Sequence, residues 1–441
     1  MQINAQVIRA TAVAGLGGLL FGFDTVVVSG TNASLTALYN LSPSGLGFTV
    51  ASALIGTVIG ALTAGIPGQK LGRRDSLRIM AALYFIAALG CAFAWSWPSL
   101  IVFRVLSGLA IGGSSVLGPM YISELSPAQY RGRLVGFFQV NIVVGVLIAY
   151  LSNYVIGLQH LGSTEWRWQL GVAAIPAALF VVALFGIPRS PRWLAMMGRR
   201  EEALKVLNLI GDPDPQKRLD RIEKEINEER AVAHMPLFRK AHARGIFVAV
   251  TVGAFTQFSG INAILYYLSD IFRLGGATSI SSAGQSVAVG ATNLVATLIA
   301  MSLIDKIGRK KLLLTGTFGL VICLFLVGLV FHMDAHKTLL VWLLMAYIAC
   351  FAFSQGAVVW VYISEVFPTA VRAKGQALGS SSHWIFNAII SYAFPVMLRR
   401  SSAATFWFFS AMMVLDLVLV STLYPETSNV SLEDISAHLS H

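Results

Sequence analysis

The chain has 441 residues, of which 56% are hydrophobic and only 12% are charged. Soluble domains carry about twice that share of charged residues, and a single water-soluble core cannot bury so much apolar surface. The composition excludes a soluble enzyme, a disordered chain and a small disulfide scaffold. It predicts an all-α integral membrane protein.

Apolar stretches long enough to cross a bilayer as helices lie on both sides of one polar segment. Before this segment we expect spans at 10–30, 46–68, 78–97, 99–123, 134–155 and 168–187. After it we expect spans at 246–271, 283–304, 312–332, 338–364, 375–397 and 403–423. The sequence therefore predicts twelve transmembrane helices in two sets of six.

The polar segment, residues 189–244, holds 22 of the 53 charged residues of the chain. Helical patterns at 199–210 and 215–232 are separated by Gly211 and Pro213, so we expect a small cytoplasmic helical segment here. The predicted domains are an N-terminal half at 1–188, a linker at 189–244, a C-terminal half at 245–424 and a tail at 425–441.

The basic residues predict the orientation of the chain. With the N-terminus inside the cell, 26 of the 32 Lys and Arg residues fall on the cytoplasmic side, and both termini are cytoplasmic. This bias accounts for the net charge of +11 without nucleic acid. Cys91, Cys323 and Cys350 lie in separate spans, with no disulfide or metal-ligand spacing, so we expect no metal and no cofactor.

Two short patterns occur once in each set of six spans. Tyr-Ile-Ser-Glu at 121–124 recurs at 362–365, and a Lys-Leu-Gly-Arg string at 70–73 recurs as Lys-Ile-Gly-Arg at 306–309. Two six-helix halves in the same orientation are the parallel-repeat plan of many transporters, with substrate at the midplane.

The repeated charges lie at predicted cytoplasmic helix ends, where ion pairs across the halves could latch that side shut. The candidate latch residues are Arg73, Glu124, Arg131, Asp305, Arg309, Glu365 and Arg372. The alternative is that the basic residues only set topology. Acidic residues contribute little to topology, so the repetition of Glu favours the latch.

Asp24 and Arg104 are ionisable residues inside spans, and such residues are functional candidates by default. At 1.5 Å per residue, Asp24 lies about 9 Å and Arg104 about 7–8 Å below the outer membrane edge. We therefore expect them to pair, as a proton-coupling site or as a static ion pair between helices. Asp416 in the last span has no basic partner at matching depth, and its role stays open.

Several spans also carry amides and aromatic side chains, which suit a neutral polyhydroxyl molecule better than an anion. Any single amide could instead be a helix–helix hydrogen bond. Gly260 and Gly356 are expected to break their helices. His383 could be a ligand, a proton-exchanging group or a satisfied interior histidine.

The strings GFDTVVVSG, QFSGINAILYY and WVYISEVFP, with PET at 425–427, make the whole chain resemble the sugar porter family of the major facilitator superfamily. The resemblance implies a twelve-helix fold, alternating access and, in proton-coupled members, an Asp in the first span facing an Arg in the fourth. It also implies substrate-binding residues at Phe21, Gln139, Gln257, Asn262, Tyr266, Asn293, Trp360, His383, Trp384 and Asn387.

The sequence departs from the family pattern at several positions. Thr256 replaces the first of two glutamines, and His383 replaces a Gln or Asn before the span-eleven Trp, which changes the expected sugar selectivity. Ala357 replaces a Pro, while Gln69 and Arg189 replace acidic residues in the cytoplasmic loops, which indicates an altered inner latch.

The sequence favours a secondary active transporter that imports a neutral monosaccharide or polyol with a proton through Asp24. An uncoupled sugar facilitator, a proton-coupled exporter and a transport-dead receptor are the alternatives. An enzyme is not expected, because no nucleophile–base pair appears. The expected partners are sugar, proton and lipid, for a monomer in the bacterial inner membrane.

Overall fold

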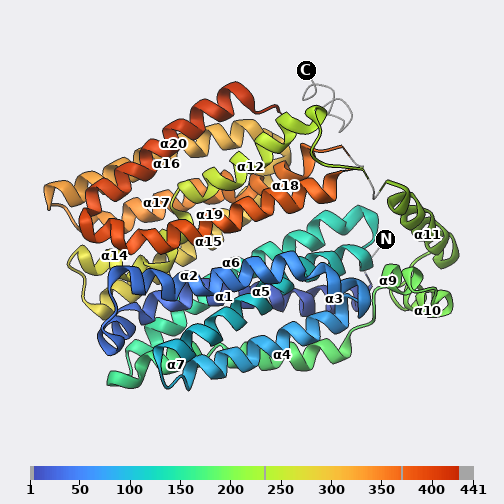
Figure 1. The fold of residues 1–441 in the computed structure, drawn as a ribbon, viewed down its shortest axis with the longest axis horizontal. Coiled ribbons are helices and arrows are strands. Elements are labelled where there is room, and N and C mark those ends of the chain that lie inside the picture. Colours follow the sequence, from blue (N-terminus) through green and yellow to red (C-terminus); the bar gives the residue numbers. More distant parts are fainter. Residues whose placement is uncertain (1–3, 233–234, 369–370, 427–441) are drawn as a thin grey trace. The chain divides into compact units, whose positions relative to one another are not determined.

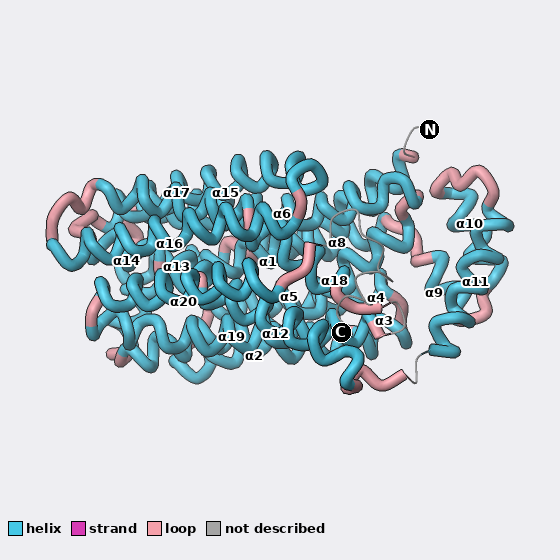
Figure 2. Tube along the Cα trace, turned by 90° about the horizontal axis from the view of Figure 1, so that it is seen from above, coloured by secondary structure: helices cyan, strands magenta, loops and turns pink. Residues whose placement is uncertain are grey.

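The computed structural model describes residues 4–232, 235–368 and 371–426, and the regular elements in these ranges are helices (Figure 1, Figure 2). The predicted all-α architecture is confirmed. The helices before the polar segment are α1 Ala5–Tyr39, α2 Pro43–Thr63, α3 Gly65–Lys70, α4 Arg73–Ala92, α5 Trp97–Leu125, α6 Arg131–Gly157, α7 Glu165–Gly171 and α8 Ala174–Ala183.

The remaining helices complete the chain. In the polar segment they are α9 Pro191–Met196, α10 Arg200–Leu209 and α11 Pro215–Val232. After it come α12 Ala243–Phe258, α13 Ile261–Tyr266, α14 Leu268–Leu274, α15 Ser279–Ile307, α16 Arg309–Met333, α17 Leu339–Phe353, α18 Gln355–Glu365, α19 Arg372–Arg400 and α20 Ser402–Leu423. Short 3₁₀ turns lie at Ala128–Tyr130, Gly162–Thr164, Leu184–Gly186 and Lys240–His242.

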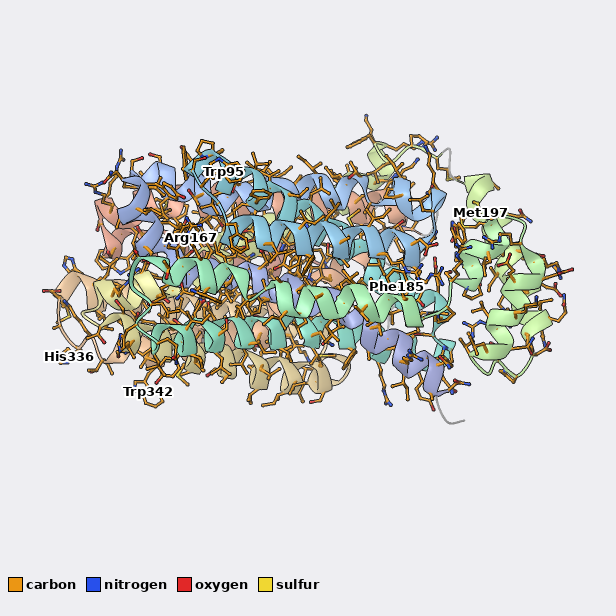
Figure 3. All side chains as sticks on the ribbon, turned by 90° about the horizontal axis from the view of Figure 1, so that it is seen from below. Trp95, Arg167, Phe185, Met197, His336 and Trp342 are labelled. Carbon is orange, nitrogen blue, oxygen red and sulfur yellow. The ribbon has the colours of Figure 1, made fainter. Side chains whose placement is uncertain are left out.

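Eleven helical segments of the described chain are long and apolar enough to cross a membrane. The twelfth expected span, 375–397, lies in α19, whose 29 residues give it sufficient length. Its serines, His383 and Asn387 lower its hydropathy below that of the other spans. Large apolar side chains are exposed on these helices and their loops, including Trp95, Phe185 and Trp342 (Figure 3), as expected where lipid is the solvent.

The described residues form two compact units. Unit 1 contains residues 4–24, 55–146 and 170–232. Unit 2 contains residues 25–54, 147–169, 235–368 and 371–426. Unit boundaries thus fall inside α1, α2, α6 and α7, while the division at 188 and 245 into two six-helix halves stays a prediction.

Glycines allow α1 and α6 to approach closely within unit 1. A Cβ atom at Gly22 would collide with the carbonyl of Ile142, and one at Gly145 would collide with the carbonyl of Leu19. Small residues of this kind let helix backbones come into contact in membranes. The contact holds the part of α1 that carries Asp24 against α6.

The seventh span is broken at Gly260, as expected. This residue lies between α12 and α13 with φ of 84°, a left-handed conformation that glycine adopts without strain. The hydroxyl of Tyr347 donates to the carbonyl of Ser259 at 2.9 Å, so the break does not leave that carbonyl without a hydrogen bond.

The tenth span is broken at Ser354, and the expectation of a break at Gly356 was wrong. Ser354 has φ of −111° and ψ of −97° between α17 and α18, whereas Gly356 lies inside α18. The Ser354 hydroxyl donates to the carbonyl of Cys350 at 2.7 Å. Gly316 of α16 packs directly against Ser354, because a Cβ there would overlap the serine side chain.

Helices α9, α10 and α11 group together at one end of the unit 1 helices (Figure 1, Figure 2). Hydrogen bonds join this group to the rest of unit 1; among them, Trp193 Nε1 donates to the carbonyl of Gln69 at 2.8 Å, and Arg218 Nη2 donates to the carbonyl of Ser126 at 3.0 Å. Buried Leu207 and Leu219 give α10 and α11 an apolar face. The predicted helices at 199–210 and 215–232 therefore match α10 and α11.

Candidate functional site

The structure brings Asp24 and Arg104 together in unit 1. Arg104 Nη1 lies 3.1 Å from Asp24 Oδ1, and the exposed fractions of the two side chains are 4% and 12%. Tyr84 of α4 donates its hydroxyl to the same carboxylate oxygen at 3.4 Å. The sequence interpretation missed Tyr84, because a tyrosine in an apolar stretch carries no pattern that distinguishes it from a core residue.

The start of α5 determines the position of Arg104. Ser96 caps this helix in a capping box: its side chain accepts from the backbone N–H of Ser99, and the Ser99 side chain accepts from the Ser96 N–H. Pro98 lies in the first turn, where its missing N–H has no effect on the helix. The sharp start places Arg104 about two turns into α5, at the depth of Asp24.

A chain of polar side chains runs through unit 2 at the candidate sugar-binding residues. Asn262 Nδ2 donates to Gln257 Oε1 at 2.9 Å, and Gln257 Nε2 lies 3.0 Å from Nε2 and 3.2 Å from Nδ1 of His383. Oε1 of Gln257 accepts from Asn262, so the Nε2 nitrogen of Gln257 is the atom that faces the His383 imidazole. The break at Gly260 makes this possible, since it brings Asn262 back toward Gln257.

Aromatic rings surround His383. The Trp360 ring centroid lies 4.8 Å from that of His383, and the Trp384 ring meets the imidazole edge to face at 5.1 Å. His383 and Trp384 are buried, whereas Trp360 is 40% exposed. Trp360 therefore offers a flat apolar face beside the amide chain, the combination that a sugar ring with its hydroxyls requires.

The other candidate binding residues make separate contacts. Asn387 Nδ2 donates to the Tyr266 hydroxyl at 3.2 Å, while its Oδ1 accepts from Ser391 at 3.1 Å. Asn293 is buried. The two remaining residues belong to unit 1, where Phe21 on α1 and Gln139 on α6 are half-buried.

Polar contacts close one end of unit 2 around α13 and α14. Asn32 of α1 donates to the carbonyl of Tyr266 at 3.1 Å and to Asp270 Oδ2 at 2.7 Å. Tyr150 of α6 donates to the carbonyl of Leu265 at 2.8 Å. These contacts tie the ends of two early helices to the seventh span and leave Tyr266 buried, and the sequence interpretation did not foresee them.

In unit 1 the latch residues Arg73 and Glu124 pair with each other. Arg73 Nη2 lies 2.8 Å from Glu124 Oε1, and both side chains are almost fully buried. Ser190 donates to Glu124 Oε2 at 2.5 Å and also caps α9. Arg131, the third latch candidate in this unit, is exposed. Glu124 therefore anchors the polar helices to the start of α4.

In the corresponding region of unit 2, a different acidic residue contacts the start of the helix. Arg309 lies 3.6 Å from Glu365, but Glu426 accepts the backbone N–H groups of Arg309 and Lys310 at 3.0 and 3.1 Å. Glu426 thus neutralises the positive end of the α16 dipole. The side chain of Asp305 lies outside the described residues. Of the predicted latch residues in this region, Glu365 lies at the end of α18 and Arg372 at the start of α19.

The internal repeat extends to tertiary contacts. The Tyr121 hydroxyl donates to the carbonyl of Pro188 at 2.6 Å, and the Tyr362 hydroxyl donates to the carbonyl of Pro425. The residues after these prolines have opposite charge. Whereas Glu426 caps α16, Arg189 pairs at 3.0 Å with Asp75 in the first turn of α4. In the first repeat the residue after the proline is the base Arg189, and its acidic partner Asp75 lies on the helix. In the second repeat the residue after the proline is the acid Glu426.

Replacing Glu124 with glutamine should lower the stability of the protein. Glu124→Gln leaves Arg73 buried without its counter-charge, and breaking a buried pair costs roughly 3–5 kcal/mol. Thermal unfolding in detergent should show a clearly lower midpoint. Glu202→Gln, which removes a carboxylate from an exposed pair with Arg199, is the control and should leave the midpoint in place. Equal midpoints for the two variants would contradict the anchoring role.

Comparison with known proteins identifies the fold and family. The sequence profile described as "Sugar (and other) transporter" matches residues 10–439. The chain belongs to the sugar transporter family. It is 35% identical to the D-xylose-proton symporter of Escherichia coli K12, over 98% of this chain and 96% of that protein.

Two further similarities extend this result. The Arabinose-proton symporter of Bacillus subtilis is also 35% identical, over 97% of this chain and 94% of its own length. The inward-open structure of the xylose transporter from Escherichia coli aligns with a TM-score of 0.87 at 35% identity, covering 98% of this chain and 99% of the other. The fold is that of the major facilitator transporters, and the protein is a multi-pass membrane transporter rather than an enzyme.

Proposed function

We propose that this protein moves a neutral monosaccharide or polyol across the bacterial inner membrane by alternating access, in symport with a proton. The observation that carries the proposal is the buried ion pair between Asp24 and Arg104. Ionisable residues inside a membrane are rare and commonly belong to ion or proton pathways. The names of the two symporters similar to this chain support the same reaction.

The proton step follows from the surroundings of Asp24. While Arg104 and Tyr84 contact the carboxylate, they stabilise its charged form. When the guanidinium moves away, the buried carboxyl group is more stable with a proton bound. Rocking of helices that separates α1 from α5 therefore couples proton uptake at Asp24 to the conformational cycle.

The substrate side of the proposal rests on the chain from Asn262 through Gln257 to His383. Amides offer directed donors and acceptors to hydroxyl groups, and Trp360 offers an apolar face. We assign Phe21, Gln139, Asn293 and the residues around Tyr266 to the same substrate pathway. His383 stands where the family pattern has Gln or Asn, so we expect it to change the sugar selectivity.

We assign the end that holds the latch residues to the cytoplasmic side, with both termini inside the cell, because Lys and Arg concentrate there. Arg73–Glu124 and Arg309–Glu365 then brace the two repeats at this side. A monomer suffices for this cycle, because one chain carries both the proton residues and the sugar residues.

Purified protein in liposomes tests the function directly. With an inward proton gradient, we expect one member of a labelled panel of glucose, galactose, xylose, arabinose, fructose and inositol to accumulate, and a protonophore to abolish the accumulation. Uptake that only equilibrates would replace symport by facilitated diffusion. No uptake of any member, together with proton-driven efflux of another solute, would favour an exporter.

A further inference from the structure

Asp416 is a buried acid in the middle of α20 that the proton and sugar sites do not use. It is 3% exposed. Its Oδ2 accepts hydrogen bonds from Gln355 Nε2 at 2.9 Å and from the Thr317 hydroxyl at 3.4 Å. Gln355 and Thr317 are themselves buried, at 2% and 0% exposure. Three helices, α16, α18 and α20, therefore meet at this carboxyl group.

No basic side chain of the described chain forms an ion pair with Asp416. Helices α12, α16 and α19 pack against α20, and α18 contacts it through Gln355. The charged groups of these four helices lie near helix ends. Those groups are Arg244 on α12, Arg309, Lys310 and Lys311 on α16, Glu365 on α18, and Arg372, Lys374, Arg399 and Arg400 on α19.

Two of these groups make contacts elsewhere. Arg309 pairs with Glu365, and Lys310 donates to the carbonyl of Ser421 at 3.0 Å. The other titratable groups of this region are also bonded, since His383 contacts Gln257 and the Tyr424 hydroxyl donates to Thr251 at 2.8 Å. A charged carboxylate at Asp416 would thus be buried without a counter-ion, which is strongly unfavourable.

Gln355 supplies an independent observation. Its carbonyl oxygen Oε1 is buried and has no hydrogen-bond partner among the described residues. A charged Asp416 can only accept hydrogen bonds, so it cannot satisfy this oxygen. A protonated Asp416 carries an O–H donor, and a carboxylic acid facing a primary amide can exchange two hydrogen bonds with it. One added proton thus removes both the uncompensated charge and the unsatisfied acceptor.

We propose that Asp416 is a second proton-binding site, that it holds a proton in this conformation, and that it shares the proton with Gln355. The site lies at a helix break, because Gln355 is the first residue of α18, directly after Ser354. Thr317 lies next to Gly316, which packs on Ser354. The neutral acid therefore ties α20 and α16 to the point where the tenth span bends.

Infrared spectroscopy of the purified protein tests the proton directly. The difference between wild type and D416N at neutral pH should show loss of a carboxylic-acid carbonyl band that shifts in deuterium oxide. D334N, which removes an exposed carboxylate paired with Lys337, is the matched control and should show loss of carboxylate bands only. Loss of carboxylate bands in D416N as well would overturn the proposal.

Two further variants keep the test independent of folding and of Asp24. Q355L leaves Asp416 in place, and its acid band should move because the amide partner is gone; an unmoved band would overturn the sharing of the proton. In liposomes, D416N resembles the neutral acid and should keep the wild-type uptake rate, whereas D416A removes the bridge and should slow uptake. Equal loss in D416N and D416A would show that the charged form is required, against the proposal.

Discussion

Replacing Asp24 with asparagine should abolish proton-driven accumulation of the substrate while leaving exchange of the substrate across the membrane intact. Asparagine retains hydrogen bonding to Tyr84 and Arg104 but cannot bind and release a proton. With one proton per sugar, an inward gradient of one pH unit supports about tenfold accumulation, since about 1.4 kcal/mol corresponds to a factor of ten. In liposomes, Asp24→Asn should therefore bring the accumulation ratio to one.

The control for this variant is Asp334→Asn, which removes a carboxylate from an exposed pair with Lys337. It should accumulate substrate as wild type does. Counterflow of labelled substrate in Asp24→Asn shows whether the variant is folded and still cycles. Accumulation by Asp24→Asn at the wild-type ratio would make the Asp24–Arg104 contact a structural ion pair and the coupling site would have to lie elsewhere.

Replacing Gln257 with alanine should have a comparably large effect on substrate binding. The substitution removes a proposed sugar ligand and leaves Asn262 and His383 without their shared partner. Each buried polar group left without a hydrogen bond costs about 1–3 kcal/mol. We therefore expect a 10- to 100-fold weaker apparent affinity, or about 1.4–3 kcal/mol, measured by calorimetry with the sugar that the uptake assay identifies.

Gln159→Ala is the matched control, because this glutamine is exposed in the loop after α6. Its affinity for the sugar should equal that of wild type. Thermal unfolding of both variants without sugar separates a loss of binding from a loss of folding. An unchanged affinity in Gln257→Ala would remove the chain from Asn262 to His383 from the sugar site and reduce it to a helix–helix contact.

The two variants probe different steps and should separate cleanly. Asp24→Asn keeps the polar chain of unit 2, so it should still bind sugar and exchange it. Gln257→Ala keeps the Asp24–Arg104 pair, so at saturating sugar it should still accumulate substrate in response to the proton gradient. A variant that lost both properties would indicate a general defect in folding or cycling.

Hydropathy and charge are enough to predict the order of the helices along the chain. A membrane span can be recognised from the sequence alone, because each helix forms its own backbone hydrogen bonds and carries apolar side chains over a known length. Hydropathy therefore located the spans, and charge located α10 and α11. The pairing of Asp24 and Arg104 was also predicted, by counting residues from expected span ends at 30 and 99. Because α1 continues to Tyr39, it is the contact and not the count that establishes the pair.

The contacts between side chains, in contrast, become visible only in the folded protein. Rotation and packing of each helix determine partners such as Tyr84 for Asp24 and Gln355 for Asp416, and hydropathy contains no information about rotation. The tenth span bends at Ser354 rather than at Gly356, because the approach of Gly316 and the hydroxyl of Ser354 stabilise the break there. The position of a residue along its own helix can be read from the sequence near it, whereas its contacts depend on helices that are distant in the chain.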